Sequence, residues 1–437
     1  MPGRFVRYND MFDFARHLEQ VEEKIAALVA KNETERAIGL YEVFLAAAYD
    51  KIEECDDSGA NLSMFWQELF CGWIKARQAG GRLAEETIQQ ILRWQESDGY
   101  GFCYRIEQDV VQVLDPAGYA LFVQHYERLV NEGLADITDP KPTAIFEYEN
   151  DVRLPALALK NIYEAKGDTK SYAALCDRTG LSPRDCERLV EMEMSKKRWW
   201  QALAWVEKGV ELEATRNWHN EGSHGLESKK PEILAKLGRK DESLALAWAD
   251  FEKHPSDHTY ERLMEYVPKA AIAEWHGRAM ETAAKADIGG FLDICVATGE
   301  WERLASRVLE ESDDALEGLS HFSMEPGAKG LATHNIPAAA KLYRALGFRI
   351  LTSKKSKYYG VALSHFRHVR DLCQRAKRDA EWQAVVDRVY AEHSRKNSFM
   401  PRFERLLAGE MESNPSFEEQ ARARWRQQTN GAPFDLL

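Results

Sequence analysis

Apolar residues recur at spacings of three and four along most of this 437-residue chain, and this periodicity constrains its fold more than any other feature. In the first such segment, Val21, Ile25 and Leu28 would share one face of a helix. The helix-favouring residues Ala, Leu, Glu, Arg and Lys are plentiful, whereas runs of β-branched residues are few. The sequence therefore predicts an all-α fold.

Further segments of this kind follow one another as far as residue 132. One helix is expected over 33–54, and it ends at the acidic and small residues 55–59, which suit a turn and the next helix cap. The other segments expected in this part are one that ends at Gly80, one that ends at Ser97, and two around 103–114 and 117–132.

The stretch from Asp136 to Asp151 interrupts the helical periodicity and contains Pro140 and Pro142. Proline and turn-forming residues between periodic segments indicate a loop or linker. We therefore expect a boundary here, with an acidic N-terminal helical domain at 1–139 and a linker at 140–151.

After this stretch, paired helical segments recur around a similar joint, which is a small or basic turn that carries an acidic residue. The joints are Gly167-Asp168, Gly238 to Asp241, Gly299 to Trp301, and Lys377 to Asp379. They lie about 60 to 80 residues apart, roughly twice the 34-residue period of a tetratricopeptide unit. This spacing predicts a right-handed α-solenoid of stacked helix pairs, tetratricopeptide-like, over 152–408. A capping helix and tail are expected over 409–437.

The net charge of −13 is unevenly distributed. Residues 1–151 contain 14 Lys and Arg against 28 Asp and Glu, a net charge of −14, whereas residues 338–408 contain 16 against 6, a net charge of +10. Such a layout is either a set of solvated helix faces or a means of attracting oppositely charged partners. A second copy of the chain is one such partner, so self-association through opposite charge is open.

The sequence contains no recognisable metal or cofactor motif. The seven cysteines are dispersed without a C-x-x-C pair, so we expect reduced thiols in the core. His219 and His224 resemble a zinc-protease pair, but five residues of helix would separate them by about 140°. The acidic run 53–57 lacks the glutamate that completes an EF-hand, and a helix stop and cap explains it better. We therefore expect neither a metal nor a cofactor.

Arg388 and His393 have the R-x4-H spacing of helical ribonucleases that resemble the HEPN group. About one such pair is expected by chance in a chain of this composition, so a surface arginine on a helix is the favoured explanation. An unrecognised hydrolase or nuclease stays open as an alternative, because an acidic protein offers many carboxylates for acid and base catalysis.

Two blocks of the sequence carry a family resemblance. The first block is Ala37 to Leu129 and includes Asp98-Gly99-Tyr100-Gly101 and Asp115 to Tyr119. The second includes Ile233 to Glu242, Lys357-Tyr358-Tyr359, Glu381-Trp382 and His393 to Lys396. These blocks resemble a bacterial family of uncharacterised helical-repeat proteins, which is related to the non-zinc helical part of SWIM zinc-finger proteins. The resemblance implies a helical-repeat fold. The SWIM finger itself, C-x-C followed by C-x-H, is missing, so the zinc and nucleic-acid roles of that module do not carry over.

The segment with the most functional promise is basic and aromatic. Its candidate binding residues are Lys354, Lys355, Lys357, Tyr358, Tyr359, Arg395 and Lys396. The cations could hold carboxylates or phosphates, and exposed tyrosines could stack on bases or fill a peptide groove.

The leading hypothesis is a non-enzymatic scaffold that binds a protein or peptide, an acidic partner included. Nucleic-acid binding through residues 338–408 is the alternative. The chain has no apolar run long enough to span a membrane and no apolar signal segment at its start, so we expect a cytoplasmic protein without a membrane partner.

Overall fold

The protein consists of α-helices joined by turns and short 3-10 segments. A computed structural model describes the following residues: 5–137, 144–215, 218, 225–353 and 355–409. Within them the only strand-like pairing is an isolated bridge between Val6 and Cys55, so the predicted all-α fold is confirmed. None of the described helices is long and apolar enough to cross a membrane. The predictions that concern Pro140, Pro142, His219, His224, Lys354 and the tail from residue 410 fall outside the described residues.

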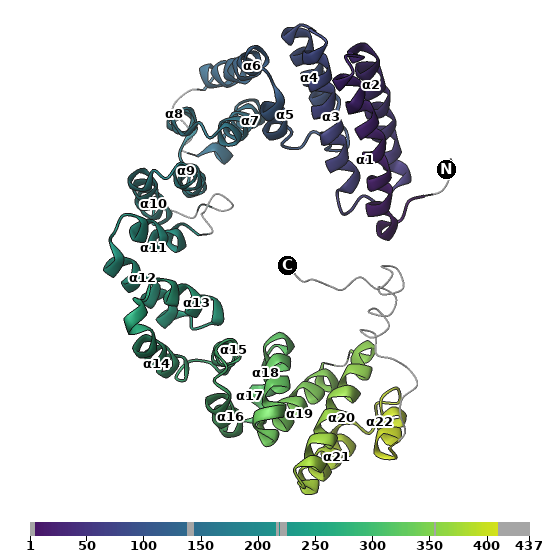
Figure 1. The fold of residues 1–437 in the computed structure, drawn as a ribbon, viewed down its shortest axis with the longest axis vertical. Helices are drawn as coiled ribbons and strands as arrows, with labels where there is room; N and C mark the ends of the chain where they lie inside the picture. Colours follow the sequence, from purple (N-terminus) through teal and green to yellow (C-terminus); the bar gives the residue numbers. More distant parts are fainter. Residues whose placement is uncertain (1–4, 138–143, 216–217, 219–224, 354, 410–437) are drawn as a thin grey trace. The chain divides into compact units, whose positions relative to one another are not determined.

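The chain forms two compact units, Met1–Gly238 and Arg239–Leu437, and Figure 1 shows the helices of each. The helices of the first unit are α1 (Tyr8–Ala30), α2 (Thr34–Asp50), η1 (Lys51–Glu54), α3 (Asn61–Ala79), α4 (Ala84–Ser97), α5 (Glu107–Val113), α6 (Pro116–Ala135), η2 (Ile145–Glu147), α7 (Asn150–Lys166), α8 (Thr169–Thr179), α9 (Pro183–Ser195), α10 (Trp199–Glu213) and α11 (Leu226–Lys236). The helices of the second unit are α12 (Lys240–Lys253), α13 (Asp257–Tyr266), η4 (Lys269–Ala271), α14 (Ile272–Ala283), α15 (Ile288–Thr298), α16 (Trp301–Glu310), α17 (Asp313–Gly318), α18 (His321–His334), α19 (Ile336–Thr352), η5 (Ser356–Tyr358), α20 (Tyr359–Arg375), α21 (Asp379–His393) and α22 (Met400–Leu407).

The helices expected in the N-terminal region are present within a few residues of their predicted limits. The segment 33–54 is α2 followed by η1, and the next two helices end one residue before Gly80 and at Ser97. The acidic run that follows η1 acts as a cap, as predicted. The carboxylate of Asp57 accepts the backbone N–H groups of Leu62 at 2.8 Å and Ser63 at 3.1 Å, which are otherwise unpaired at the start of α3.

Three of the predicted joints contain a glycine between the end of one helix and the start of the next. Gly167 after α7, Gly238 after α11 and Gly299 after α15 have φ of 66°, 81° and 75°, in the left-handed region that glycine tolerates. After the first of these joints, the Asp168 side chain accepts the backbone N–H of Ser171 at 3.1 Å and caps α8.

One hydrophobic core extends through the first unit from α1 to α9. Trp66, Phe70 and Trp94 pack in its centre, with ring centroids 4.8 to 6.2 Å apart. The same core contains Phe122 from α6 and Leu159 from α7, which lie on either side of the predicted linker at 140–151. The helices α6 and α7, on either side of this segment, pack against each other. The division between the two compact units lies further along the chain, after Gly238.

A buried ion pair joins α7 to α9 within this unit. Lys160 Nζ lies 2.7 Å from Asp185 Oδ1, and both residues are 4% exposed. Asp185 also accepts the hydroxyl of Tyr172 at 2.9 Å and the hydroxyl and N–H of Ser182. Burial alone would raise the pKa of Asp185, but the Lys160 ammonium and the Ser182 hydrogen bonds hold it below its usual value.

The core of the second unit is built around α19, which packs between α18 and α20. Small residues on α19 allow this close packing, and Gly347 faces the ring of Phe366 on α20. Phe348 meets the same ring edge-on at 5.2 Å between centroids. This packing places the last turns of α19 and the first turns of α20 side by side.

Among the described glycines of the second unit, Gly290, near the start of α15, lies closest to a neighbouring backbone segment. A Cβ atom there would lie 2.1 Å from the carbonyl oxygen of Pro255, which as a backbone atom cannot turn away. We expect Gly290→Ala to destabilise the unit by about 3 kcal/mol, measured by urea unfolding. Gly277→Ala is the control, because its Cβ would meet nothing within 4 Å and a mid-helix alanine should raise stability by about 0.5–1 kcal/mol. Equal stability of the two variants would contradict this packing.

Candidate functional site

The predicted basic and aromatic residues lie mainly in the turn between α19 and α20. Lys355 and Lys357 are exposed, and Tyr358 is 37% exposed. The ammonium of Lys357 lies 4.8 Å from the centroid of the Tyr358 ring, within the range of a cation–π contact. The side chains of these three residues are therefore accessible from solvent.

Tyr359 and Lys396 have a different environment from the one expected. Tyr359 is only 5% exposed and packs edge-on against Phe399, at 5.5 Å between ring centroids. Lys396 Nζ lies 3.5 Å from the Tyr359 hydroxyl. Because Tyr359 is the first residue of α20 and its ring belongs to the core, it offers no exposed face for stacking. Arg395 is exposed.

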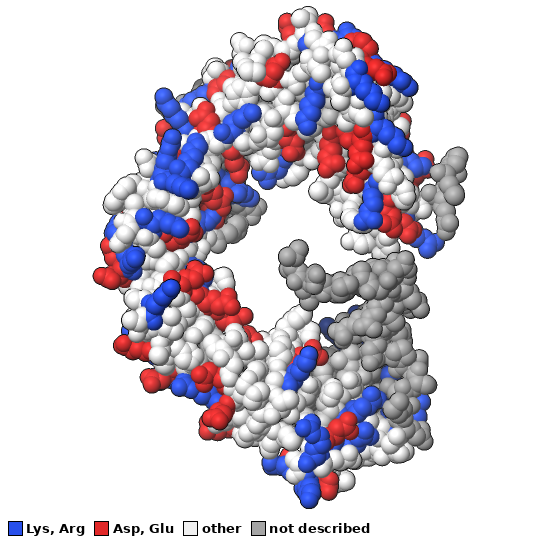
Figure 2. Space-filling model, viewed as in Figure 1, with Lys and Arg blue, Asp and Glu red and all other residues white. Residues whose placement is uncertain are grey.

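Several cations of the basic region 338–408 are engaged within the second unit. Lys341 donates at 2.9 Å to the backbone carbonyl of Leu309, and Arg344 pairs with Asp313. Arg370 donates at 2.9 Å to a backbone carbonyl of α22. Figure 2 shows Lys and Arg side chains over α20 and α21, but the net charge of +10 overstates what is available to a partner.

A cleft of about 560 Å³ lies between α18, α19, η5 and α20, and we call it the α18–α20 cleft. Its polar lining includes His321, Glu325, Arg349, Lys355, Tyr358 and His365. Leu346, Ile350 and Val361 supply apolar surface. The volume is in the range of small-molecule sites. The structure thus brings two of the predicted residues, Lys355 and Tyr358, into a cleft.

The cations of this cleft are available for a ligand. Arg349 and Lys355 have no ion-pair partner in the part of the chain that the structure describes. Glu317, which also lines the cleft, is already neutralised by Arg388 at 2.5 Å. An anion that enters the cleft would therefore meet two uncompensated positive charges and one carboxylate, that of Glu325.

His365 is a buried polar side chain in the wall of the same cleft. It is 5% exposed, and its Nδ1 atom has no hydrogen-bond partner among the described residues. Burial, followed by the charges of His368 and His321, lowers its pKa to about 4. The ring is therefore neutral at physiological pH, and its Nε2, 3.7 Å from Glu325, forms no ion pair. A buried polar atom without a hydrogen-bond partner lowers stability by about 1–3 kcal/mol.

Arg388 and His393, the pair with ribonuclease-like spacing, both contact the ring of Phe348. The Arg388 guanidinium lies 3.9 Å from the ring centroid and is held by Glu317 and by Glu392 at 3.1 Å. His393 is 8% exposed, and burial lowers its pKa. These contacts support a structural role for the arginine on the helix surface.

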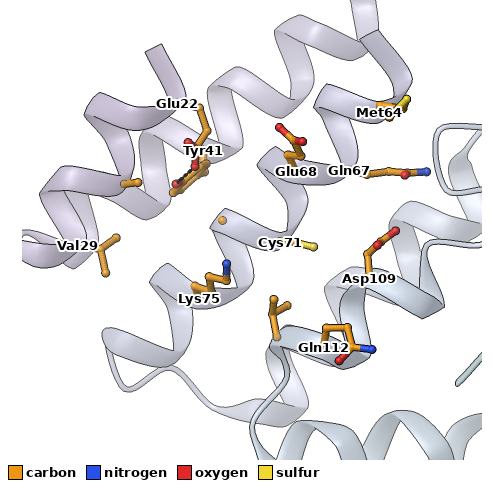
Figure 3. A pocket seen from close by; sticks show the side chains of 13 residues that line it. Glu22, Val29, Tyr41, Met64, Gln67, Glu68, Cys71, Lys75, Asp109 and Gln112 are labelled. Carbon is orange, nitrogen blue, oxygen red and sulfur yellow. Dashed lines mark hydrogen bonds between the residues drawn. The ribbon is translucent and has the colours of Figure 1, made fainter. Parts of the chain in front are cut away.

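A second cleft, of about 620 Å³, lies in the first unit between α1, α2, α3 and α5, and we call it the acidic cleft (Figure 3). The polar and charged side chains that line it include Glu22, Tyr41, Glu68, Cys71, Lys75 and Asp109. Figure 2 shows acidic side chains gathered around α3 and α5 in the same unit. No motif in the sequence predicts this site.

The carboxylates of the acidic cleft come from three helices. Tyr41 on α2 donates its hydroxyl to Glu22 on α1 at 2.7 Å. Burial, followed by the negative charges of Glu19 and Glu22, raises the pKa of Glu68 on α3. Burial also raises the pKa of Asp109 on α5. The ionised forms of Glu68 and Asp109 are therefore less favourable here than in water.

Lys75 is the one Lys or Arg that lines the acidic cleft among the described residues. It forms no ion pair with the three carboxylates, so the cleft keeps an excess of negative charge. Cys71 is not poised as a nucleophile, because burial raises the pKa of its thiol to about 12. All seven cysteines are free and six are buried, as predicted.

No group of His, Cys, Asp or Glu in the described residues is arranged to hold a metal ion. A protein family described as a family of unknown function (DUF6880) matches residues 3–402. A comparison with curated proteins gave no match. Neither comparison provides a link to SWIM zinc-finger proteins or to tetratricopeptide arrays, so those resemblances remain predictions.

Proposed function

Because the chain belongs to DUF6880, a family of unknown function, we propose a function from its own residues. The protein is a non-enzymatic helical-repeat scaffold that binds a protein partner, and it takes a basic segment of that partner into the acidic cleft of the first unit.

The packing of the helices supports a repeat architecture. Within each unit, every pair of helices in substantial contact is adjacent in the chain or separated by at most two other α-helices. Such local packing is characteristic of repeat proteins, in which each repeat contacts only the repeats next to it. We propose on this basis that the helices form a right-handed, tetratricopeptide-like solenoid.

The excess negative charge of the acidic cleft is the observation that carries the proposal. Glu22, Glu68 and Asp109 line one cleft with Lys75 as the counter-charge, and burial disfavours the ionised forms of Glu68 and Asp109. An incoming Lys or Arg would supply the missing positive charge and gain charge-assisted hydrogen bonds.

The apolar lining of the cleft fits the same kind of ligand. Ala26 and Val29 of α1 lie in the wall, and Met64 of α3 is 63% exposed at the cleft. Lys and Arg side chains have long apolar stems that pack on such surfaces while their charged ends meet carboxylates. A flexible methionine suits a surface that adapts to a peptide.

We expect the full chain to bind a labelled twelve-residue peptide rich in Arg and Lys, and to ignore a peptide of the same length rich in Glu. Fluorescence anisotropy over a salt series would measure both affinities. Because the attraction is between charges at an open cleft, affinity should fall as salt rises from 50 to 500 mM. Equal binding of the two peptides would refute the proposal.

Nucleic-acid binding through residues 338–408 remains a prediction. The internal ion pairs of that region reduce its free positive charge, and no further feature favours nucleic acid over an acidic protein. Binding of labelled RNA or DNA that weakens steeply with salt would support it.

A further inference from the structure

The α18–α20 cleft has two chemically different ends. The turn end contains Arg349, Lys355 and the hydroxyl of Tyr358. The far end contains His365 on α20 and Glu325 on α18, which lie within 3.7 Å of each other. Tyr358 and His365 are seven residues apart, and this corresponds to about 10 Å along a helix.

From this arrangement we propose that the α18–α20 cleft binds a small organic phosphate of about the size of a nucleoside monophosphate. Its phosphate lies at the turn end with Arg349 and Lys355. Its hydroxyl or amino groups lie at the far end with Glu325 and His365. The site is in the second unit and does not depend on the acidic cleft of the first.

The turn end suits a phosphate because its donors are uncommitted. The Arg349 guanidinium presents a planar fork that matches two phosphate oxygens, and Lys355 adds a second positive charge. The Tyr358 hydroxyl, on an exposed side chain, can donate a further hydrogen bond. Glu317 does not oppose this, since Arg388 neutralises it.

The far end suits neutral polar groups and excludes a second anion. Glu325 accepts hydrogen bonds from hydroxyl or amino donors, and the neutral His365 presents its Nε2 atom beside that carboxylate, as a donor or an acceptor according to its tautomer. The Nδ1 atom of His365 is buried without a hydrogen-bond partner among the described residues and takes no part in binding. Between the two ends, Leu346, Ile350 and Val361 contact the body of the ligand.

Isothermal titration of the full chain tests the proposal with four probes: adenosine monophosphate, ribose 5-phosphate, adenosine and inorganic phosphate. At least one of the two phosphate esters should bind at least tenfold more tightly than adenosine and inorganic phosphate. If neither ester exceeds inorganic phosphate, the proposal fails, and the cleft holds no organic phosphate.

Two variants with a matched control locate the binding. Arg349→Gln should weaken binding of the ester at least tenfold, whereas Lys285→Gln, which removes an exposed cation of the second unit outside the cleft, should leave it unchanged. An equal loss in both variants would show a general basic surface and overturn the site. His365→Phe should weaken binding about fivefold without lowering the unfolding midpoint, because it removes an unmet polar atom. Unchanged binding by that variant would overturn the assignment of the far end.

Discussion

The double variant Glu68→Gln, Asp109→Asn is expected to bind the basic peptide about tenfold more weakly than the unaltered chain. Each carboxylate faces the acidic cleft from a different helix, α3 and α5 (Figure 3). Partly exposed ion pairs contribute up to about 1 kcal/mol each, and about 0.7 kcal/mol from each of two pairs corresponds to tenfold in affinity. Fluorescence anisotropy at 100 mM salt would measure the change.

Glu23→Gln is the matched control for this double variant. Glu23 adjoins Glu22 on α1 and is exposed, but it does not line the cleft, so its loss changes the charge of the same region without changing the site. A loss of affinity in the control as large as in the double variant would indicate long-range attraction alone, and the cleft would not be the binding site.

The variants that lose binding should not lose stability. Because the pKa of Glu68 is raised in the folded protein, its ionised form opposes folding, and that penalty appears as the pH rises through the raised pKa. Glu68→Gln stays neutral at every pH. It should therefore be at least as stable as the unaltered chain at pH 7, with no difference below the unfolded pKa of about 4.3. Thermal unfolding at both pH values would measure this.

Lys160→Met is expected to destabilise the first unit by about 3–5 kcal/mol, because it leaves the buried carboxylate of Asp185 without a counter-charge. Urea unfolding at pH 7 would measure the loss. Arg128→Met, in the exposed pair with Glu132 on α6, is the control and should cost less than about 0.5 kcal/mol. Similar losses in the two variants would contradict the assignment of a buried ion pair.

The same variant has a predictable pH dependence. The lowered pKa of Asp185 means that its stabilisation is present above the unfolded pKa of about 3.9 and is lost as the pH falls through the folded value. Without Lys160, burial would instead raise that pKa, so the gap between variant and unaltered chain should narrow in acid. Asp185→Asn added to Lys160→Met should recover part of the loss at pH 7, because the amide carries no charge.

The helices could be predicted because their signals are local. An apolar stripe such as Val21, Ile25 and Leu28 identifies a helix by itself, and residues such as Asp57 and Gly167 mark the ends. The division into compact units could not be predicted in this way. The division depends on which helices pack against each other. The helices α6 and α7 do so, although the sequence between them contains prolines.

The surroundings of the candidate binding residues could be predicted only in part. Tyr358 and Tyr359 are neighbours with the same chemistry, yet one is exposed at a cleft and the other is buried against Phe399, since the start of α20 places them on different faces. The acidic cleft brings together Glu22 and Asp109, which are 87 residues apart in the chain, and no local motif connects them. The only feature of the sequence that pointed to the acidic cleft was the net charge of −14 over residues 1–151.

Hydrogen–deuterium exchange of the full chain, with and without the Arg- and Lys-rich peptide, tests the central claim most directly. The acidic cleft predicts slower exchange in α3 and α5 on binding, with no change in the turn between α19 and α20. Peptide binding without protection of α3 and α5 would show that the basic segment is held elsewhere and would contradict the proposed function.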